Sequence, residues 1–174
     1  MNINALRSVF QKKEIDIKDS HQIKTQILSE LSKQPMVVRG YDKLNRALLL
    51  ILGRSSRSTD KEAFINTHMY MIERALACTE HATNGAQDKI AVVVNCANFE
   101  QVPSTKLLKE FFHTMEQYYP NQLAYLALID APVLIRSIWF IVKPFIHPEV
   151  VDLIKFVSGD VSFVYLCVVY ILGF

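Results

Sequence analysis

The sequence predicts an α/β fold, with a mainly parallel mixed sheet flanked by helices. Short apolar runs that suit buried strands recur at residues 47–52, 90–95 and 123–130. Between them stand longer segments in which apolar residues recur every three or four positions, as in amphipathic helices. Strands that alternate with helices are typical of crossover connections between parallel strands, so we expect helices to cover the sheet.

The first expected helix covers residues 22–32, because Ile23, Ile27, Leu28 and Leu31 are at helical spacing. The residue before a proline disfavours helical geometry, so this helix should stop before Pro35. The first expected strand, at 47–52, is apolar throughout, which predicts burial on both of its faces. A polar loop follows at 53–59.

The helix after this loop is predicted to open on a capping box, Thr59-x-x-Glu62, and to end at Asn84-Gly85. One of its faces is apolar and should face the sheet: Phe64, Ile65, Met69, Ile72, Ala75 and Leu76. The next strand ends in Asn95. A third helix is capped by Ser104 or Thr105 and stopped by Pro120. Its apolar side comprises Leu107, Leu108, Phe111, Phe112, Met115 and Tyr119.

The helix expected at 133–142 is apolar nearly all the way round, since only Arg136 and Ser137 are polar. A surface helix should show a broad polar face. This helix therefore needs apolar partners on every side, which indicates contact with a lipid or a membrane; an ordinary buried core helix is the alternative. A break at Lys143-Pro144, a short helix from Pro148 and a strand at 154–157 complete the expected core.

Composition restricts the function. The chain of 174 residues suits one domain, and its net charge of +2 is spread without a basic stripe, so we expect no nucleic-acid partner. Three cysteines far apart, Cys78, Cys96 and Cys167, suit buried thiols in a reducing compartment, and the N-terminus lacks the apolar core of a signal peptide. We therefore expect a cytoplasmic protein. The uncharged segment 161–174 is too short to span a bilayer as a helix and favours a buried strand.

No catalytic motif is present in the sequence. There is no Gly-x-Ser-x-Gly elbow, no glycine-rich phosphate loop and no pair of histidines at ligand spacing. The spacing of Cys78-x-x-His81 resembles that of a zinc site, but no second pair accompanies it. We therefore expect neither an enzyme nor a metal or other cofactor.

Two stretches carry a resemblance to a known family. Residues 118–132, YYPNQLAYLALIDAP, combine Tyr-Tyr-Pro with a strand that ends before Ala-Pro, and residues 141–156, IVKPFIHPEVVDLIKF, contain Lys-Pro-Phe. At this spacing they resemble the CRAL-TRIO lipid-binding domain, the family of phosphatidylinositol/phosphatidylcholine transfer proteins. Weaker similarity at 39–51, 71–75 and 90–95 extends the match to residues 38–156 in one consistent order.

The resemblance implies a function: one hydrophobic lipid, such as a phospholipid or phosphoinositide, bound in an apolar cavity under a mobile gate helix and transferred between membranes. It implies that the gate and pocket residues are Ile138, Trp139, Ile141, Val142 and Phe145. At a membrane surface, where the protein is expected to be peripheral, Trp139 suits the boundary, and Arg136 and Lys143 suit anionic head groups.

For the lipid head group the resemblance implies Lys155, with Asn121 standing where family members that bind phosphatidylinositol have a glutamate. The alternative for Lys155 is a solvated lysine at the start of a strand. Three parts are expected: an N-terminal helical segment (1–37), the lipid-binding domain (38–160) and an atypical apolar tail (161–174) of a truncated or spliced form. The alternative function is a protein-interaction or regulatory module whose cavity is filled or incomplete. No oligomeric state is predicted.

Overall fold

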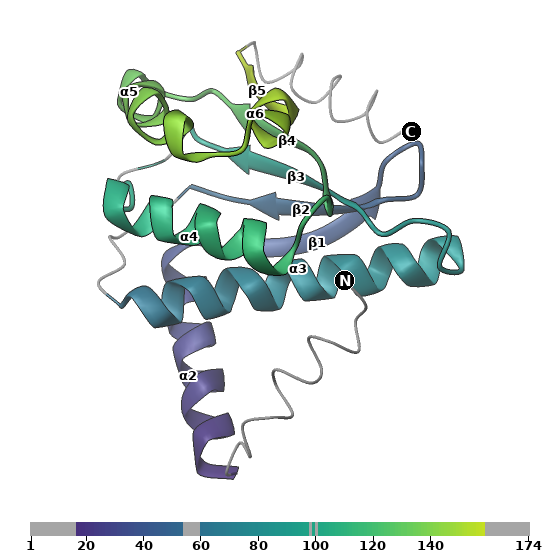
Figure 1. Ribbon diagram of the computed structural model, residues 1–174. Helices are drawn as coiled ribbons and strands as arrows, with labels where there is room; N and C mark the ends of the chain where they lie inside the picture. The colour runs from purple at the N-terminus through teal and green to yellow at the C-terminus, as the bar shows by residue number, and fades with distance from the viewer. Residues whose placement is uncertain (1–16, 54–59, 98, 100, 159–174) are drawn as a thin grey trace.

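A computed structural model describes residues 17–53, 60–97, 99 and 101–158 of the chain (Figure 1). Five strands form one sheet in the order β1-β2-β3-β4-β5. Their bounds are Met36–Tyr41 (β1), Ala47–Ile51 (β2), Ile90–Asn95 (β3), Leu123–Ile129 (β4) and Ile154–Val157 (β5). β2 to β5 run parallel and β1 pairs antiparallel with β2, which confirms the predicted mainly parallel mixed sheet.

β1 was not predicted as a separate strand. Gly40 has a φ of +76° inside it, and the register with β2 shifts between Val38 and Tyr41. The turn into β2 is organised by Asp42, whose Oδ1 accepts hydrogen bonds from the backbone N–H groups of Leu44 (2.9 Å) and Arg46 (3.0 Å). A glycine and an irregular register weaken the alternation by which strands are recognised.

The helices follow the prediction closely. They are α2 (Ile17–Lys33), α3 (Lys61–Thr83), α4 (Thr105–Tyr118), α5 (Val133–Val142) and α6 (Pro148–Leu153), with a 3-10 turn, η1 (Lys143–Phe145), at the predicted break. Asn84, in the left-handed conformation, ends α3, and the Ser104 side chain caps α4, as expected. The predicted capping box was wrong, because the side chain that caps α3 belongs to Asp60, which accepts from the Ala63 N–H at 3.0 Å.

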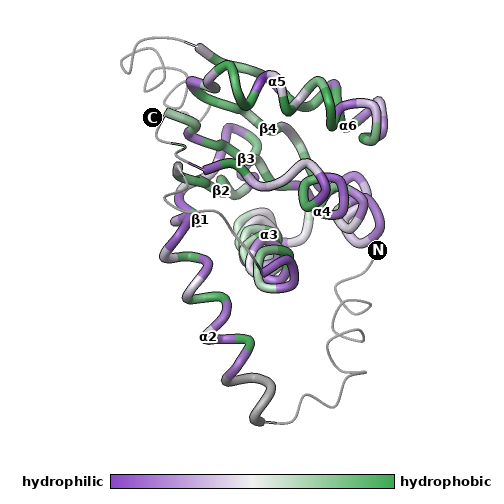
Figure 2. The backbone as a smooth tube through the Cα atoms, turned by 90° about the vertical axis from the view of Figure 1, so that its left-hand side faces the viewer, coloured by the Kyte–Doolittle hydropathy of each residue, from purple (hydrophilic) through white to green (hydrophobic). Residues whose placement is uncertain are grey.

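The two faces of the sheet carry separate apolar clusters. One packs against α3, with Leu49, Val92 and Met71 among its buried members. In Figure 2 the strands are stacked and α3, α4 and α6 lie to one side of them. The alternate residues, which include Leu48, Val93 and Ala127, form the cluster on the opposite face. Strands buried on both faces are what the apolar runs predicted.

Some predictions lie outside the described residues: those for the loop at 54–59, for Cys167 and for the tail at 161–174. The division of the chain at residues 38 and 160 remains a prediction. Within the described ranges, no helix has both the length and the apolar character needed to cross a membrane.

Candidate functional site

A cavity of about 520 Å³ lies between the α3 face of the sheet and four helices. The sheet forms its floor, mainly with apolar residues: Leu49, Ile51, Ile90, Val92, Val94, Leu126, Leu128 and Ile154. Its walls come from α3 (Phe64, His68, Ile72), α4 (Leu108, Phe111, Phe112, Met115), α5 (Ile135, Ile138, Trp139, Val142) and α6 (Val150, Leu153). Cavities of several hundred Å³ with apolar walls and few polar groups are typical of small-molecule sites.

Helix α5 separates this cavity from solvent. Its inner residues are one helical stripe, at positions i, i+3, i+4 and i+7: Ile135, Ile138, Trp139 and Val142. Its other side is apolar but exposed, with Val133, Leu134, Phe140 and Ile141 in solvent; Phe140 is 73% exposed. The helix that is apolar all round therefore covers a cavity with one face and presents the other face outward.

The predicted gate residues are divided between these two faces. Ile138, Trp139 and Val142 line the cavity, whereas Ile141 and Phe145 are exposed. Trp139 turns inward to meet Phe156 of β5, so the outward position expected for the tryptophan is held instead by Phe140 and Ile141.

The predicted membrane-contacting cations also differ in position. Arg136 is half-buried: its Nε donates to the Ala131 carbonyl at 3.2 Å, and its guanidinium carbon lies 5.1 Å from the centre of the Phe156 ring. Lys143 is exposed at the end of α5. A further cation, Lys109 of α4, places its Nζ 3.4 Å from the centre of the Phe145 ring, which connects α4 to the turn after α5.

Two residues that line the cavity, Gln34 and Gln122, each have a buried side-chain Oε1 without a hydrogen-bond partner among the described residues. Gln34 directly follows α2 and is only 4% exposed. Gln122 lies at the amino end of β4, where its backbone carbonyl accepts from the Ile90 N–H at 2.9 Å. Buried polar atoms in proteins are nearly always satisfied, so these two oxygens are exceptions within the packed wall of the cavity.

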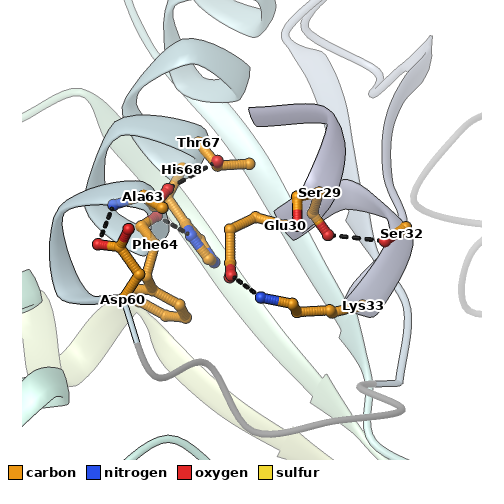
Figure 3. Close-up of polar contacts among 9 residues, drawn as sticks. All are labelled: Ser29, Glu30, Ser32, Lys33, Asp60, Ala63, Phe64, Thr67 and His68. Atoms are coloured by element: carbon orange, nitrogen blue, oxygen red, sulfur yellow. Dashed lines mark hydrogen bonds and ion pairs between the residues drawn. The ribbon is translucent and has the colours of Figure 1, made fainter. Parts of the chain in front are cut away.

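Near Gln34, α2 packs against α3. Figure 3 shows the polar contacts within each of these two helices. Glu30, 2% exposed, pairs with Lys33 at 2.7 Å, and its carboxylate points toward the His68 ring. His68 Nδ1 donates to the Phe64 carbonyl at 2.8 Å, since a carbonyl oxygen can only accept. These contacts hold Lys33, which precedes Gln34, and His68, which belongs to the wall of the cavity.

Two ionisable residues that line the cavity, Cys96 and Tyr119, have a raised pKa. Burial, with a smaller effect of Asp130, raises the pKa of the Cys96 thiol to about 11. Burial and the neighbouring Glu73 carboxylate, which accepts from the Tyr119 hydroxyl at 3.0 Å, raise the pKa of Tyr119. Neither group ionises near neutral pH, so neither is an activated nucleophile or base.

The structure does not bring the two predicted head-group residues together. Asn121 lines the cavity, in a left-handed conformation (φ 60°) before β4. Lys155 is exposed and follows Ile154, which lines the cavity, so its side chain leaves from the opposite face of the sheet. Its strand partner is Ala127, roughly 20 Å of chain beyond Asn121. Whether either residue contacts a head group remains a prediction.

Most of the residues that form the wall of the cavity were not predicted to do so from the sequence. A helix face turned toward a cavity has the same apolar spacing as one packed on a core, so Phe111 and Met115 read only as core positions. Gln34 directly precedes Pro35, Gln122 lies two residues after Pro120, and neither carries a recognisable signal. In the part of the chain that the structure describes, no group of three His, Cys, Asp or Glu residues could hold a metal ion.

The fold and the cavity define a small α/β domain with a mainly apolar cavity between its sheet and its helices. The sequence profile of the CRAL/TRIO domain matches residues 31–165, more than half of the chain. The chain therefore belongs to the CRAL/TRIO family, whose fold is a lipid-binding fold, and the predicted resemblance is confirmed.

Comparison with solved structures gives the same fold. The crystal structure of Sfh5 is similar, with a TM-score of 0.59 and 13% sequence identity over 89% of this chain. At that identity the similarity shows the fold alone, and the chain covers 62% of the length of Sfh5. A search among curated protein sequences found no match.

Proposed function

We propose that this domain binds a single hydrophobic lipid in the cavity and exchanges it with membranes, without chemical change to the lipid. One observation carries the proposal: a cavity of about 520 Å³ is walled by a helix, α5, whose outer face is also apolar. The inner face suits a lipid chain and the outer face suits a membrane surface. A single element can thus contact both the ligand and its source.

The cavity supplies the driving force for binding. Each methylene group buried from water contributes about 0.8 kcal/mol, so a chain of a dozen or more carbons needs only apolar walls and few polar anchors. The open volume also weighs against the alternative function, an interaction module with a filled cavity. Large side chains from α4 and α5 surround the space without filling it.

The outer face of α5 supports a peripheral position at membranes. Val133, Leu134, Phe140 and Ile141 are exposed side by side, and Lys143 follows them at the end of the helix. An amphipathic or apolar helix with a nearby cation can lie in the membrane interface, where its apolar side chains are buried and the cation meets anionic head groups. We propose that α5 is the gate and that the cytosolic leaflet is where it opens.

For the polar end of the lipid, Asn121 is the member of the predicted pair that lines the cavity. We assign Lys155, on the opposite face of the sheet, no place inside the cavity. A role in reading a head group would require contact outside it.

A transfer assay tests the function. Donor vesicles carrying a fluorescent single-chain lipid are mixed with acceptor vesicles and the full chain, and the rate of transfer is compared with that of vesicles alone. Val150→Trp should slow transfer, because Val150 lines the cavity and the larger side chain fills it. Val151→Trp is the matched control, since Val151 is also half-buried on α6 but does not line the cavity. Equal rates with and without protein would refute the proposal.

A further inference from the structure

The short turn after α5 carries an exposed aromatic ring. η1 lies between two buried residues, Val142 (1% exposed) and Ile146 (5% exposed), which fix it to the body of the domain. Phe145, the last residue of η1, is 58% exposed, and Ile141, four residues earlier on the outer face of α5, is 52% exposed. The apolar outer face of α5 therefore continues into η1.

A cation from a different helix covers the Phe145 ring. Lys109 of α4 places its Nζ 3.4 Å from the centre of the ring. A cation within about 6 Å of a ring centre is attracted to the face of the ring, so at this distance the ammonium is in direct contact with it. Lys109 thus holds the C-terminal end of α5, with its turn, against α4. We name this contact between Lys109 and Phe145 the latch.

The carboxylates of α4 near Lys109 make other contacts. Glu110 pairs with Lys61 of α3 at 2.8 Å, and Glu116 Oε1 accepts the backbone N–H of His147 at 2.8 Å. In the described part of the chain no carboxylate pairs with Lys109. Its ammonium can therefore pair with an external anion once it leaves the ring.

A membrane that contains anionic phospholipids supplies such an anion. A charge-assisted hydrogen bond from an ammonium to a phosphate oxygen is stronger than a cation–π contact at an exposed site, so head-group phosphates compete successfully for Lys109. Lys143, exposed two residues before Phe145, adds to the attraction. The freed phenyl ring can then enter the interface with the outer face of α5, where burial of apolar surface is favourable.

We infer that the latch is a sensor of anionic membranes: Lys109 holds Phe145, and with it α5, in the closed position until a head-group phosphate takes the ammonium from the ring. This inference rests on the proposed function, because it names what releases the proposed gate. It gives Lys109 a role that a plain membrane contact lacks, since Lys109 restrains α5 when no anionic lipid is present.

The transfer assay tests the latch with two kinds of vesicle, phosphatidylcholine alone and phosphatidylcholine with about one part in five of phosphatidylserine. Lys109→Met removes the charge and keeps the apolar stem. Because an exposed cation–π contact shifts an equilibrium about two- to fivefold, this variant should transfer lipid about two- to fivefold faster than the parent with phosphatidylcholine alone. The stimulation by phosphatidylserine should fall by at least the same factor. A variant that equals the parent with phosphatidylcholine, or is slower, would overturn the inference and leave Lys109 as a membrane contact only.

Two further variants separate the latch from general effects of charge. Lys106→Met removes the same charge from an exposed lysine of α4 that contacts no aromatic ring among the described residues, so it should match the parent with phosphatidylcholine alone. Phe145→Leu removes the ring and keeps an apolar side chain, and it should reproduce the gain of Lys109→Met. The double variant should show no further gain, because both changes break one contact. Gains that multiply in the double variant would show that the two residues act separately and would overturn the inference.

The free chain offers a measurement without lipid. The backbone N–H of Ile146 donates to the Lys143 carbonyl at 3.1 Å, inside the segment that the latch holds. Its hydrogen exchange should be about two- to fivefold faster in Lys109→Met than in the parent, and unchanged in Lys106→Met. Unchanged exchange in Lys109→Met would overturn the inference.

The two measurements distinguish failure of the latch from failure of the proposed function. If the parent transfers lipid and neither Lys109→Met nor Phe145→Leu differs from it, the latch is wrong and the proposed function stands. If no chain transfers lipid, the proposed function fails and the inference fails with it.

Discussion

The indole ring of Trp139 packs edge-on against the phenyl ring of Phe156, with the ring centres 6.0 Å apart. This contact joins α5 to the last described strand of the sheet, and Arg136 of the same helix lies over the same phenyl ring. Phe156 therefore holds the proposed gate helix, α5, against the sheet. Opening of α5 must break the contacts of Phe156 with Trp139 and with Arg136.

Phe156→Ala should loosen the gate. Removing a half-buried phenyl ring costs about 2 kcal/mol of contact energy, and it leaves Trp139 without its aromatic neighbour. We expect tryptophan emission at longer wavelength and stronger quenching by acrylamide, with the protein still folded. Phe112→Ala is the control, because Phe112 lines the cavity from α4 and its ring packs against that of Phe111. Unchanged quenching in Phe156→Ala would show that Phe156 does not hold the gate.

Phe140→Asp should weaken binding to vesicles. Phe140 is 73% exposed on the outer face of α5, and withdrawing one such side chain from the interface costs about 1.5–3 kcal/mol, or roughly tenfold or more in affinity. Because the residue is exposed, the free energy of unfolding should change by less than about 0.5 kcal/mol. Vesicle sedimentation measures the binding.

The matched control for this variant is Leu28→Asp, which adds the same charge at an exposed leucine of α2, far from α5 in Figure 1. It should bind vesicles like the parent. If both variants lose binding equally, the effect is one of net charge and α5 is not the membrane-contacting element.

The Cys96 thiol should show an unusual pH dependence. Burial, and to a lesser degree Asp130, raises its pKa to about 11, and only the thiolate is alkylated. The rate of reaction with iodoacetamide at Cys96 should therefore keep rising about tenfold per unit up to about pH 10, whereas an ordinary thiol, with a pKa of about 8.5, levels off. Peptide mapping by mass spectrometry separates the cysteines. A plateau near pH 9 would contradict the burial of this thiol.

The same shift affects stability. A raised pKa means that the folded state holds the proton more tightly than the unfolded state. The contribution of Cys96 is therefore complete below the pKa of the unfolded thiol and is lost as the pH rises toward about 11. Cys96→Ala should remove this part of the decline in denaturant titrations.

Thr79→Val should destabilise the fold by about 1–3 kcal/mol. Thr79 is fully buried on α3, and its Oγ1 accepts the backbone N–H of Ala47 at 2.8 Å, so valine leaves that buried donor without its acceptor. Thr67→Val is the matched control: Thr67 is equally buried on the same helix, but its hydroxyl only donates to a helical carbonyl, that of Ala63. Urea unfolding should show the larger loss at Thr79. Equal losses would mean that burial of the hydroxyl, and not the bond to β2, sets the cost.

Much of the fold could be predicted from the sequence because its local signals agree with its tertiary structure. The apolar runs at β2, β3 and β4 are buried, and Ser104 and Asn84 cap helices where predicted. The errors lie where local signals are weak or ambiguous. Gly40 interrupts β1, and Asp60 is as good a cap as the threonine before it.

The cavity could be predicted only through the family resemblance. The inner stripe of α5 was named in part, but the spacing of apolar residues does not distinguish a core from a void. The side-chain oxygens of Gln34 and Gln122 have no hydrogen-bond partner among the described residues. This depends on how distant segments pack around them, which the local sequence does not show. Asn121 and Lys155 were expected to form one head-group site because of the family resemblance. In the structure Asn121 lines the cavity, whereas β5 directs the Lys155 side chain away from it.

The central claim is that the cavity holds a lipid, and mass spectrometry of the purified full chain tests it most directly. The intact protein is measured under native conditions, and organic extracts of the same sample are analysed for lipids. We predict one lipid molecule per chain, released on denaturation, or stoichiometric uptake when the chain is incubated with vesicles. A stable, monomeric protein that carries no lipid and takes up none from vesicles would contradict the account.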